Sequence, residues 1–209
     1  MEKPDTGKTG TFNLNRNPIL GKVLFPGSVI QTRICELGKI ITKDYTGKDL
    51  LLICVLRGGV MFLNDLIRHI DLELSIDFMS ISSYQGSKSI HSTGVVRITK
   101  DLEELIEGKN ILIIEDIIDT GLTASYLVRN LKSRNPNTLE VCTLLDRNVK
   151  RITEVSIKYA GFTIGQEYVV GYGLDYKQKF RNLDSIYRLD TAVIKKEFDV
   201  LDVSKDIIT

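Results

Sequence analysis

The run of residues from 111 to 123 constrains this chain more than any other, because it places two acids where burial alone would forbid them. Four apolar residues, Ile111 to Ile114, are followed directly by Glu115 and Asp116. Such an unbroken apolar run is typical of a central parallel strand that is covered on both faces, and an unpaired carboxylate in that position is costly. The two acids therefore need compensating partners, and we interpret this segment as a binding site.

The loop that follows the acid pair suits a phosphate group. It is made of small, hydroxyl-bearing or turn-permissive residues just before a helical pattern: Asp119, Thr120, Gly121, Leu122 and Thr123. Backbone N–H groups at the start of a helix attract an anion. In the alternative, Asp119 or Thr120 simply caps an ordinary helix after a core strand, which explains the loop but not the acid pair. The sequence thus predicts a strand, an acid pair, a phosphate loop and a helix, in that order.

Strand and helix patterns alternate along the rest of the chain. Apolar residues at helical spacing predict a helix that is capped by Ser28 and ends near Gly47, and further helices are expected at 60–70 and 121–134. Strands are predicted at 50–56, 74–78, 111–114, 139–145 and 168–172. This alternation predicts an α/β fold with a five-stranded parallel sheet flanked by helices, whose ligand sites lie beyond the carboxyl ends of the strands.

Length and composition set wider limits. A chain of 209 residues, of which 43% are hydrophobic and 26% charged, fits one globular domain, and no apolar run approaches the length of a membrane-spanning helix. The N-terminus resembles neither a signal peptide nor a transit peptide, so we expect a cytoplasmic protein. The net charge of +1 comes from lysines and arginines mixed with acids. We therefore expect neither a nucleic-acid nor a membrane partner.

The order of residues from 111 to 123 resembles the phosphoribosyl pyrophosphate (PRPP) signature of the type I phosphoribosyltransferases. That signature has four apolar residues, two acids, two apolar residues and then Asp-Thr-Gly-x-Thr, and every position matches here. The resemblance implies that Glu115 and Asp116 bind the ribose hydroxyls and that the loop from Asp119 to Thr123 wraps the 5′-phosphate. It also implies one phosphoribosyltransferase domain over 1–209, with a core of about 28–171 and a small hood built from the N-terminal segment and about 172–209.

Further segments narrow the resemblance to the hypoxanthine-guanine branch of the family, over about residues 20–190. Arg57 and Gly58 stand where that branch has its pyrophosphate loop, in which a non-proline cis peptide presents N–H groups to the diphosphate. Arg181 stands where an arginine contacts pyrophosphate. Ser83 and Tyr84 match a Ser-Tyr pair on the mobile catalytic loop that closes over the reacting centre.

The resemblance also implies a purine site. Tyr168 would stack on the base, the backbone of Val169 would read its edge, and Leu174 and Asp175 belong to the same segment. Arg147 stands where related enzymes carry a lysine that donates to the 6-oxo group, and the planar guanidinium is larger than an ammonium group. Because of Arg147, the order of preference for hypoxanthine, guanine and xanthine as substrates stays open. Alternatively, it is a structural residue on a surface turn.

The reaction implied is transfer of the 5-phosphoribosyl group from PRPP to N9 of hypoxanthine or guanine, which gives IMP or GMP plus pyrophosphate in purine salvage. Asp119 is the candidate general base or hydrogen-bond partner of N7. The resemblance implies a Mg²⁺ cofactor that offsets the charge of the leaving group, with Asp175, Glu115 and Asp116 as candidate ligands. A homodimer or homotetramer is expected from the resemblance alone.

Other functions remain as alternatives. The segment 169–176 argues against transfer to adenine, orotate or uracil. A PRPP-sensing regulator that binds nucleic acid needs a basic surface, and the sequence has no positive block that would supply one. A P-loop nucleotide binder requires G-x-x-x-x-G-K-[ST], which does not occur in this chain.

Overall fold

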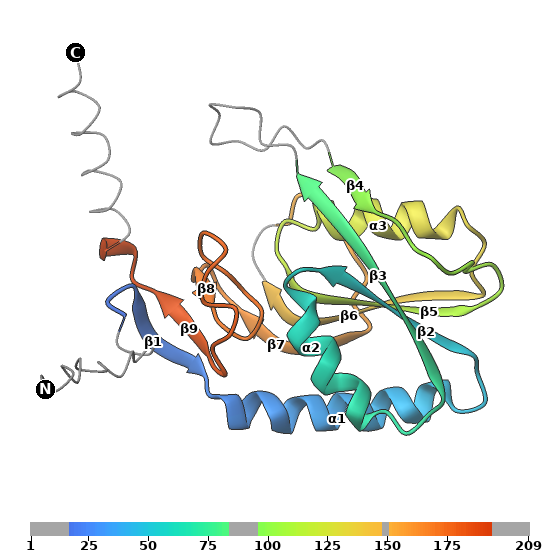
Figure 1. The fold of residues 1–209 in the computed structure, drawn as a ribbon, viewed down its shortest axis with the longest axis horizontal. Helices are drawn as coiled ribbons and strands as arrows, with labels where there is room; N and C mark the ends of the chain where they lie inside the picture. The colour runs from blue at the N-terminus through green and yellow to red at the C-terminus, as the bar shows by residue number, and fades with distance from the viewer. Residues whose placement is uncertain (1–16, 84–95, 148–150, 194–209) are drawn as a thin grey trace, which may run out of the picture.

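Two sheets organise the protein, one large and one small (Figure 1). The computed structural model describes residues 17–83, 96–147 and 151–193. Tyr84, most of the predicted catalytic loop and the tail from 194 onward lie outside the described residues. No described helix is both long enough and apolar enough to cross a membrane.

The large sheet has six strands in the order β4-β3-β2-β5-β6-β7. Their bounds are Leu50–Leu56 for β2, Leu74–Ser83 for β3, Val96–Lys100 for β4, Asn110–Ile118 for β5, Thr138–Arg147 for β6 and Tyr159–Ile164 for β7. All neighbours pair in parallel except β3 and β4. The predicted α/β class with five parallel strands is therefore confirmed, and β4 adds an antiparallel strand at one edge.

The position predicted for the fifth strand was wrong. The fifth parallel strand is β7, which pairs with β6 through Cys142 opposite Tyr159. The segment 168–172 instead contributes β8 (Val169–Val170) to the small sheet. As an edge strand β7 is only partly buried, so it carries a weak apolar pattern. The stronger apolar pattern nearby belongs to β8, in which Val169 packs in the main apolar cluster of the large sheet and Val170 in the cluster of the small sheet.

The small sheet joins segments from both ends of the described chain. Its order is β1-β9-β8, with β1 at Leu20–Phe25 and β9 at Ile186–Leu189, and both of its pairings are antiparallel. It has its own apolar cluster, which includes Val170, Phe180 and Tyr187. Residues 169–170 therefore lie in this sheet, although the predicted core extended to 171. The division into core and hood otherwise stays a prediction.

Helices cover both faces of the large sheet. On one side, α1 (Gly27–Tyr45) and α2 (Gly59–Leu66), which continues into the short 3-10 helix η2 (Ile67–His69), pack with Leu52 and Cys54. On the other side, α3 (Leu122–Lys132) packs with Leu51 and Ile53. Alternate residues of β2 thus face different helix layers, which explains its unbroken apolar run.

The predicted cap of the first helix was wrong. Pro26 occupies the N-cap position of α1 without a side-chain hydrogen bond, and Ser28 lies inside the first turn. Proline fixes φ near the helical value and lacks an N–H group, so it is well suited to a helix start even though its side chain cannot cap. The end predicted near Gly47 agrees with the observed end at Tyr45.

Candidate active site

The carboxyl ends of β2, β5 and β6 meet at one edge of the large sheet, as they must in a parallel arrangement. A cavity of about 210 Å³ opens at this edge. It is lined by the acid pair and the loop that follows: residues 115–121, 123 and 124. The structure therefore brings the predicted acid pair and phosphate loop together around one hollow.

The acid pair combines a buried Glu115 with a half-buried Asp116. Glu115 is only 6% exposed, and its carboxylate accepts no hydrogen bond from the described residues. Burial raises the pKa of Glu115 well above its usual range, and the neighbouring charge of Asp116 raises it further. Burial also raises the pKa of Asp116, although the Ile117 N–H, 2.8 Å from Oδ1, and the Arg181 guanidinium oppose this shift. A ligand that donates hydrogen bonds would relieve both groups.

The turn after β2 lies directly against this pair. The Leu56–Arg57 peptide is cis, as the resemblance implied. A Cβ atom on Gly58 would collide with the Asp116 carboxylate, so only glycine allows this approach. A Cβ atom on Gly173 would in turn collide with the Gly58 carbonyl. Three segments that are distant in the sequence therefore meet, Gly58 against the Asp116 carboxylate on one side and against the backbone of Gly173 on the other.

The phosphate loop begins α3 without a side-chain cap. Gly121 is the N-cap residue, with φ of +81°, and a Cβ atom there would collide with the Thr153 carbonyl. Asp119 does not cap the helix, so that form of the alternative was wrong. The Leu122 N–H donates a long hydrogen bond of 3.5 Å to Oγ1 of Thr120. The other N–H groups of the first turn are left for another acceptor.

Arg147 at the end of β6 joins three parts of the site. Its Nη1 donates to the carbonyls of Gly165 and Glu167 at 3.0 and 2.9 Å, and its Nε lies 3.3 Å from Oδ1 of Asp119. Because Arg147 is only 8% exposed, the alternative of a surface turn was wrong. Tyr168 follows the segment to which Arg147 donates its hydrogen bonds, and this residue is 66% exposed, so it is accessible for stacking. Asp119 is also accessible, at 54% exposure of its side chain.

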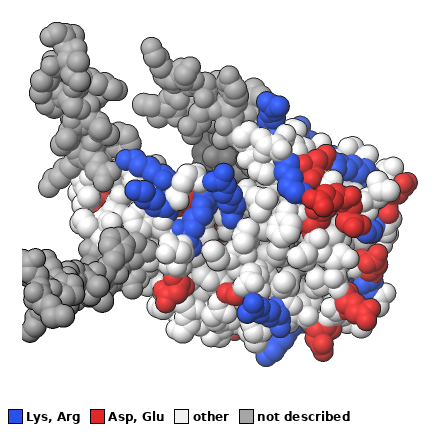
Figure 2. All heavy atoms as spheres, in the orientation of Figure 1, with Lys and Arg blue, Asp and Glu red and all other residues white. Residues whose placement is uncertain are grey.

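A second hollow, of about 500 Å³, lies beside the cis peptide. Its lining includes the guanidinium groups of Arg57 and Arg181 and hydroxyl groups from β3 and β4. Figure 2 shows Lys and Arg side chains gathered over the loops that connect β8 with β9. Nη2 of Arg181 lies 2.6 Å from Oδ1 of Asp175, and Nη1 donates to the Gly173 carbonyl at 2.7 Å.

Sequence reasoning missed Gln178, which also lines this second hollow. Its Oε1 accepts hydrogen bonds from both Arg57 and Arg181. A polar residue in a polar loop gives no local signal, and its partner Arg57 lies 121 positions away. Only the folded chain brings them together.

The other predicted residues fall into two groups. The side chains of Val169 and Leu174 are buried in apolar clusters, so only their backbones are available to a ligand. Ser83 is the last residue of β3 and pairs with Val96 of β4. Thr123 is exposed in the first turn of α3.

No group of three or more acidic, histidine or cysteine side chains in the described part of the chain forms a ready-made metal cluster. The acids near the site are Glu115, Asp116 and Asp175, and the charge of Asp175 acts on Asp116. One oxygen of Asp175 is paired with Arg181 and the other accepts the Gln178 N–H at 2.8 Å.

Comparison with known proteins identifies the family. The family described as "Phosphoribosyl transferase domain" matches residues 29–177. A hypoxanthine-guanine phosphoribosyltransferase from Mycobacterium avium is 49% identical over 180 residues, which cover 83% of this chain and 88% of that protein.

Solved structures agree with this. A hypoxanthine phosphoribosyltransferase from Staphylococcus aureus is similar with a TM-score of 0.80 and 48% identity, over 84% of this chain and 94% of that one. The Trypanosoma cruzi hypoxanthine phosphoribosyltransferase, solved in complex with the product IMP, gives a TM-score of 0.78 at 37% identity, over 85% of this chain and 98% of that one. The chain therefore belongs to the phosphoribosyltransferase family, within its hypoxanthine-guanine branch.

Proposed function

We propose that this protein transfers the 5-phosphoribosyl group of PRPP to N9 of hypoxanthine or guanine, which yields IMP or GMP and pyrophosphate for purine salvage. The observation that carries this proposal is an acid pair, the buried Glu115 without a hydrogen-bond donor among the described residues and the half-buried Asp116, set beside the start of α3 in a chain of this family. The names of the relatives supply the identity of the base.

PRPP fits the first cavity by its chemistry. The ribose hydroxyls would donate to the carboxylates of Glu115 and Asp116, which accept more strongly than neutral groups. The 5′-phosphate would take the N–H groups of the first turn of α3 and the hydroxyls of Thr120 and Thr123, where the helix dipole also favours an anion. The diphosphate would face Arg57, Arg181 and the backbone at Gly58 in the second hollow.

The base would lie between the exposed ring of Tyr168 and Asp119. In this arrangement Asp119 accepts a proton or a hydrogen bond from the imidazole part of the purine. Arg147 would keep Asp119 in place through the Nε contact at 3.3 Å and would offer a guanidinium donor near the 6-oxo group. Exclusion of water by the neighbouring loops would favour transfer over hydrolysis.

The acids present suit Mg²⁺. This ion takes oxygen ligands and usually binds through one or two carboxylates together with substrate phosphates, so a cluster of three acids is not required. Asp175, Glu115 and Asp116 would hold it, Asp175 through water because both of its oxygens already have partners. When bound, the ion would offset the negative charge of the pyrophosphate leaving group. We also propose a cytoplasmic homodimer or homotetramer, from the resemblance alone.

A steady-state assay with PRPP and Mg²⁺ against hypoxanthine, guanine, xanthine and adenine tests the function. The wild type should form nucleotide from hypoxanthine or guanine, and Asp119→Asn should lower kcat by about 10²- to 10³-fold. Asp71→Asn makes the same chemical change at an exposed position outside the site and should leave kcat unchanged. Measurable PRPP binding without product from any base would instead support a PRPP-sensing regulator. Turnover of xanthine would show that the site accepts this base with Arg147 in place of the usual lysine.

A further inference from the structure

Gln178 sits in an unusual turn. Tyr176 and Lys179 exchange both backbone hydrogen bonds, at 3.2 and 3.0 Å, so residues 177 and 178 form a two-residue hairpin loop. Both have positive φ, +51° and +64°, as the central residues of a type I′ turn do. Neither is glycine, so this conformation needs support. The Asp175 carboxylate provides it by accepting the Gln178 N–H at 2.8 Å.

This turn places the Gln178 side chain beside two guanidinium groups. Its Oε1 lies 3.2 Å from Nη1 of Arg57 and 3.1 Å from Nη2 of Arg181. Gln178 is the only hydrogen-bond partner of the Arg57 side chain among the described residues. The exposed Arg57 therefore owes its position to this one contact, whereas Arg181 is also fixed by Asp175 and Gly173.

The chemistry of the bridge matters as much as its position. An amide oxygen accepts from both guanidinium groups but carries no net charge. Two like charges are thereby brought together by a group that adds no negative charge to that of Asp175, which already pairs with Arg181. A carboxylate in the same place would make stronger contacts with both arginines and would cancel much of that charge. The neutral side chain suits a site that must still attract a polyanion.

We infer that Gln178 is a positioning residue that holds Arg57 and Arg181 together as a charged cradle for the diphosphate group of the substrate and product. The inference rests on the proposed function for the identity of this ligand. Ser80, Ser82 and Thr99 line the same hollow. Thr99 donates its hydroxyl hydrogen to Ser80, and the serine hydroxyls would add donors for phosphate oxygens. Gln178 acts through the arginines and is not itself a catalytic residue.

Two substitutions separate the roles of the acceptor and the charge. Gln178→Met keeps the approximate length of the side chain but removes the hydrogen-bond acceptor, and Gln178→Glu keeps an acceptor but adds a negative charge. Calorimetric titration with inorganic pyrophosphate at fixed Mg²⁺ should show affinity about threefold weaker for Gln178→Met and about tenfold weaker for Gln178→Glu. The KM for PRPP should rise in the same order, while the KM for the purine base stays constant.

Control variants make the result specific. Lys39→Gln, on the exposed face of α1, changes the net charge by the same amount as Gln178→Glu and should bind pyrophosphate like the wild type. In an Arg57→Ala background, Gln178→Met should cause a smaller loss than in the wild type, because one of the two groups it positions is gone. Equal thermal midpoints would exclude unfolding as the cause.

The possible outcomes are decisive. Unchanged pyrophosphate affinity in both Gln178 variants, an equal loss in Lys39→Gln, or fully additive losses with Arg57→Ala would each overturn the inference. Pyrophosphate binding is measured without a purine, so it is independent of the transferase assay. A wild type that binds pyrophosphate but forms no nucleotide would refute the proposed function and still test Gln178.

Discussion

Asp77 on β3 and Glu115 on β5 flank the same central strand and are exposed to the same small extent, 5% and 6%. Burial alone raises the pKa of both carboxyl groups. The pKa of Asp77 nevertheless lies below its ordinary value, whereas that of Glu115 lies well above it. Equal solvent exposure therefore does not decide the charge state of an acid in this sheet. Asp77 has three N–H donors and a lysine that oppose the effect of burial, whereas Glu115 lies deeper in the protein and has no donors among the described residues.

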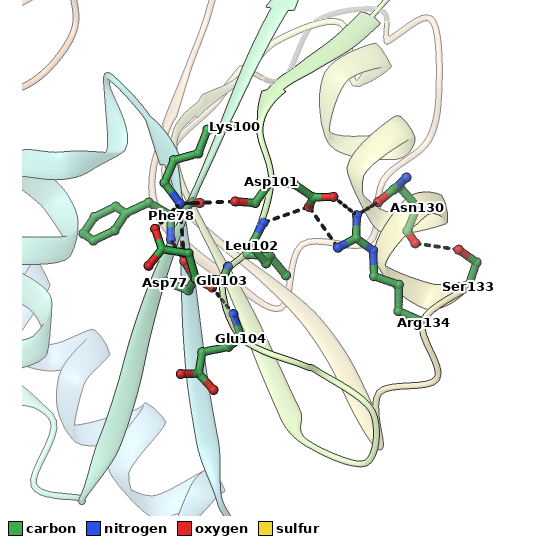
Figure 3. Close-up of polar contacts among 10 residues, drawn as sticks. All are labelled: Asp77, Phe78, Lys100, Asp101, Leu102, Glu103, Glu104, Asn130, Ser133 and Arg134. Carbon is green, nitrogen blue, oxygen red and sulfur yellow. Dashed lines mark hydrogen bonds and ion pairs between the residues drawn. The ribbon is translucent and has the colours of Figure 1, made fainter.

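Figure 3 shows the partners of Asp77. Its Oδ1 accepts the Phe78 N–H at 2.6 Å, and its Oδ2 accepts those of Glu103 and Glu104 at 2.8 and 2.9 Å, with Lys100 Nζ 3.8 Å from Oδ1. These bonds fasten the connection between β4 and β5 to the sheet.

Glu115 has no comparable donors among the described residues. We interpret Asp77 as an acid that stabilises the fold and Glu115 as an acid that binds a ligand. A buried acid without donors is thus a better indicator of a functional site than burial itself.

The largest expected effect is on catalysis. The Glu115→Gln/Asp116→Asn double variant should lower kcat/KM for PRPP by about 10³-fold, because two charge-assisted hydrogen bonds to the ribose become neutral ones. Its free energy of unfolding should equal or exceed that of the wild type, because the uncompensated carboxyl group of Glu115 and the unfavourable interaction between the two acids are removed. Steady-state kinetics and urea denaturation measure the two quantities. Wild-type kinetics in this variant would mean that the pair does not bind PRPP.

The opposite result is expected for the structural acid. Asp77→Asn should lower the free energy of unfolding by about 2–3 kcal/mol. The two carboxylate oxygens of Asp77 accept three N–H groups, and an amide in their place has no charge and only one oxygen that accepts. The activity of the folded fraction should not change. Asp71→Asn, at an exposed position, is the matched control and should shift stability by less than about 0.5 kcal/mol. A stable Asp77→Asn variant would contradict the assigned role.

The two acids should also give stability opposite dependences on pH. The lowered pKa of Asp77 means that its contribution is present above its unfolded-state pKa of about 3.9 and is lost as the pH falls through the folded-state pKa. The raised pKa of Glu115 means that this residue does not destabilise the fold below its unfolded-state pKa of about 4.3. Its destabilising effect grows as the pH rises toward its folded-state pKa.

Urea denaturation from pH 3 to 8 would reveal both. The loss of unfolding free energy in Asp77→Asn relative to the wild type should become smaller at acidic pH. The gain of unfolding free energy in Glu115→Gln should also become smaller at acidic pH. Either difference remaining constant across this range would contradict the corresponding pKa shift.

The smallest effect is expected at the edge of the Asp77 network. Arg134 on the segment after α3 pairs with Asp101 at 2.9 Å, but Asp101 is 52% exposed (Figure 3). Arg134→Gln should therefore cost only about 0.5 kcal/mol of stability, and the difference should decrease in high salt. A cost comparable to that of Asp77→Asn would show that the network acts as one unit.

Local order was predictable from the sequence where neighbouring residues carry the signal. The acid pair, the loop and α3 follow one another along the chain, so their residue types and spacing were sufficient. The strand end predicted at Ile114 was wrong, because β5 continues through both acids to Ile118 in pairing with β6. The fifth strand was misplaced because β7 is a partly buried edge strand, and its assignment depends on pairing with β6 rather than on its own pattern. Edge strands carry less of the apolar signal on which prediction relies.

Sequence alone determined the α/β class, the parallel arrangement of the sheet and the identity of the segment that carries the acids, because apolar periodicity and motif order are local properties. Only the tertiary structure decided that Arg147 forms an ion pair with Asp119, that Gly58 lies against Asp116, and that Gln178 bridges Arg57 and Arg181. These contacts join strand ends and loops that are far apart in the chain. Their distances depend on how the two sheets and the helices pack, which residue types and spacing do not encode locally.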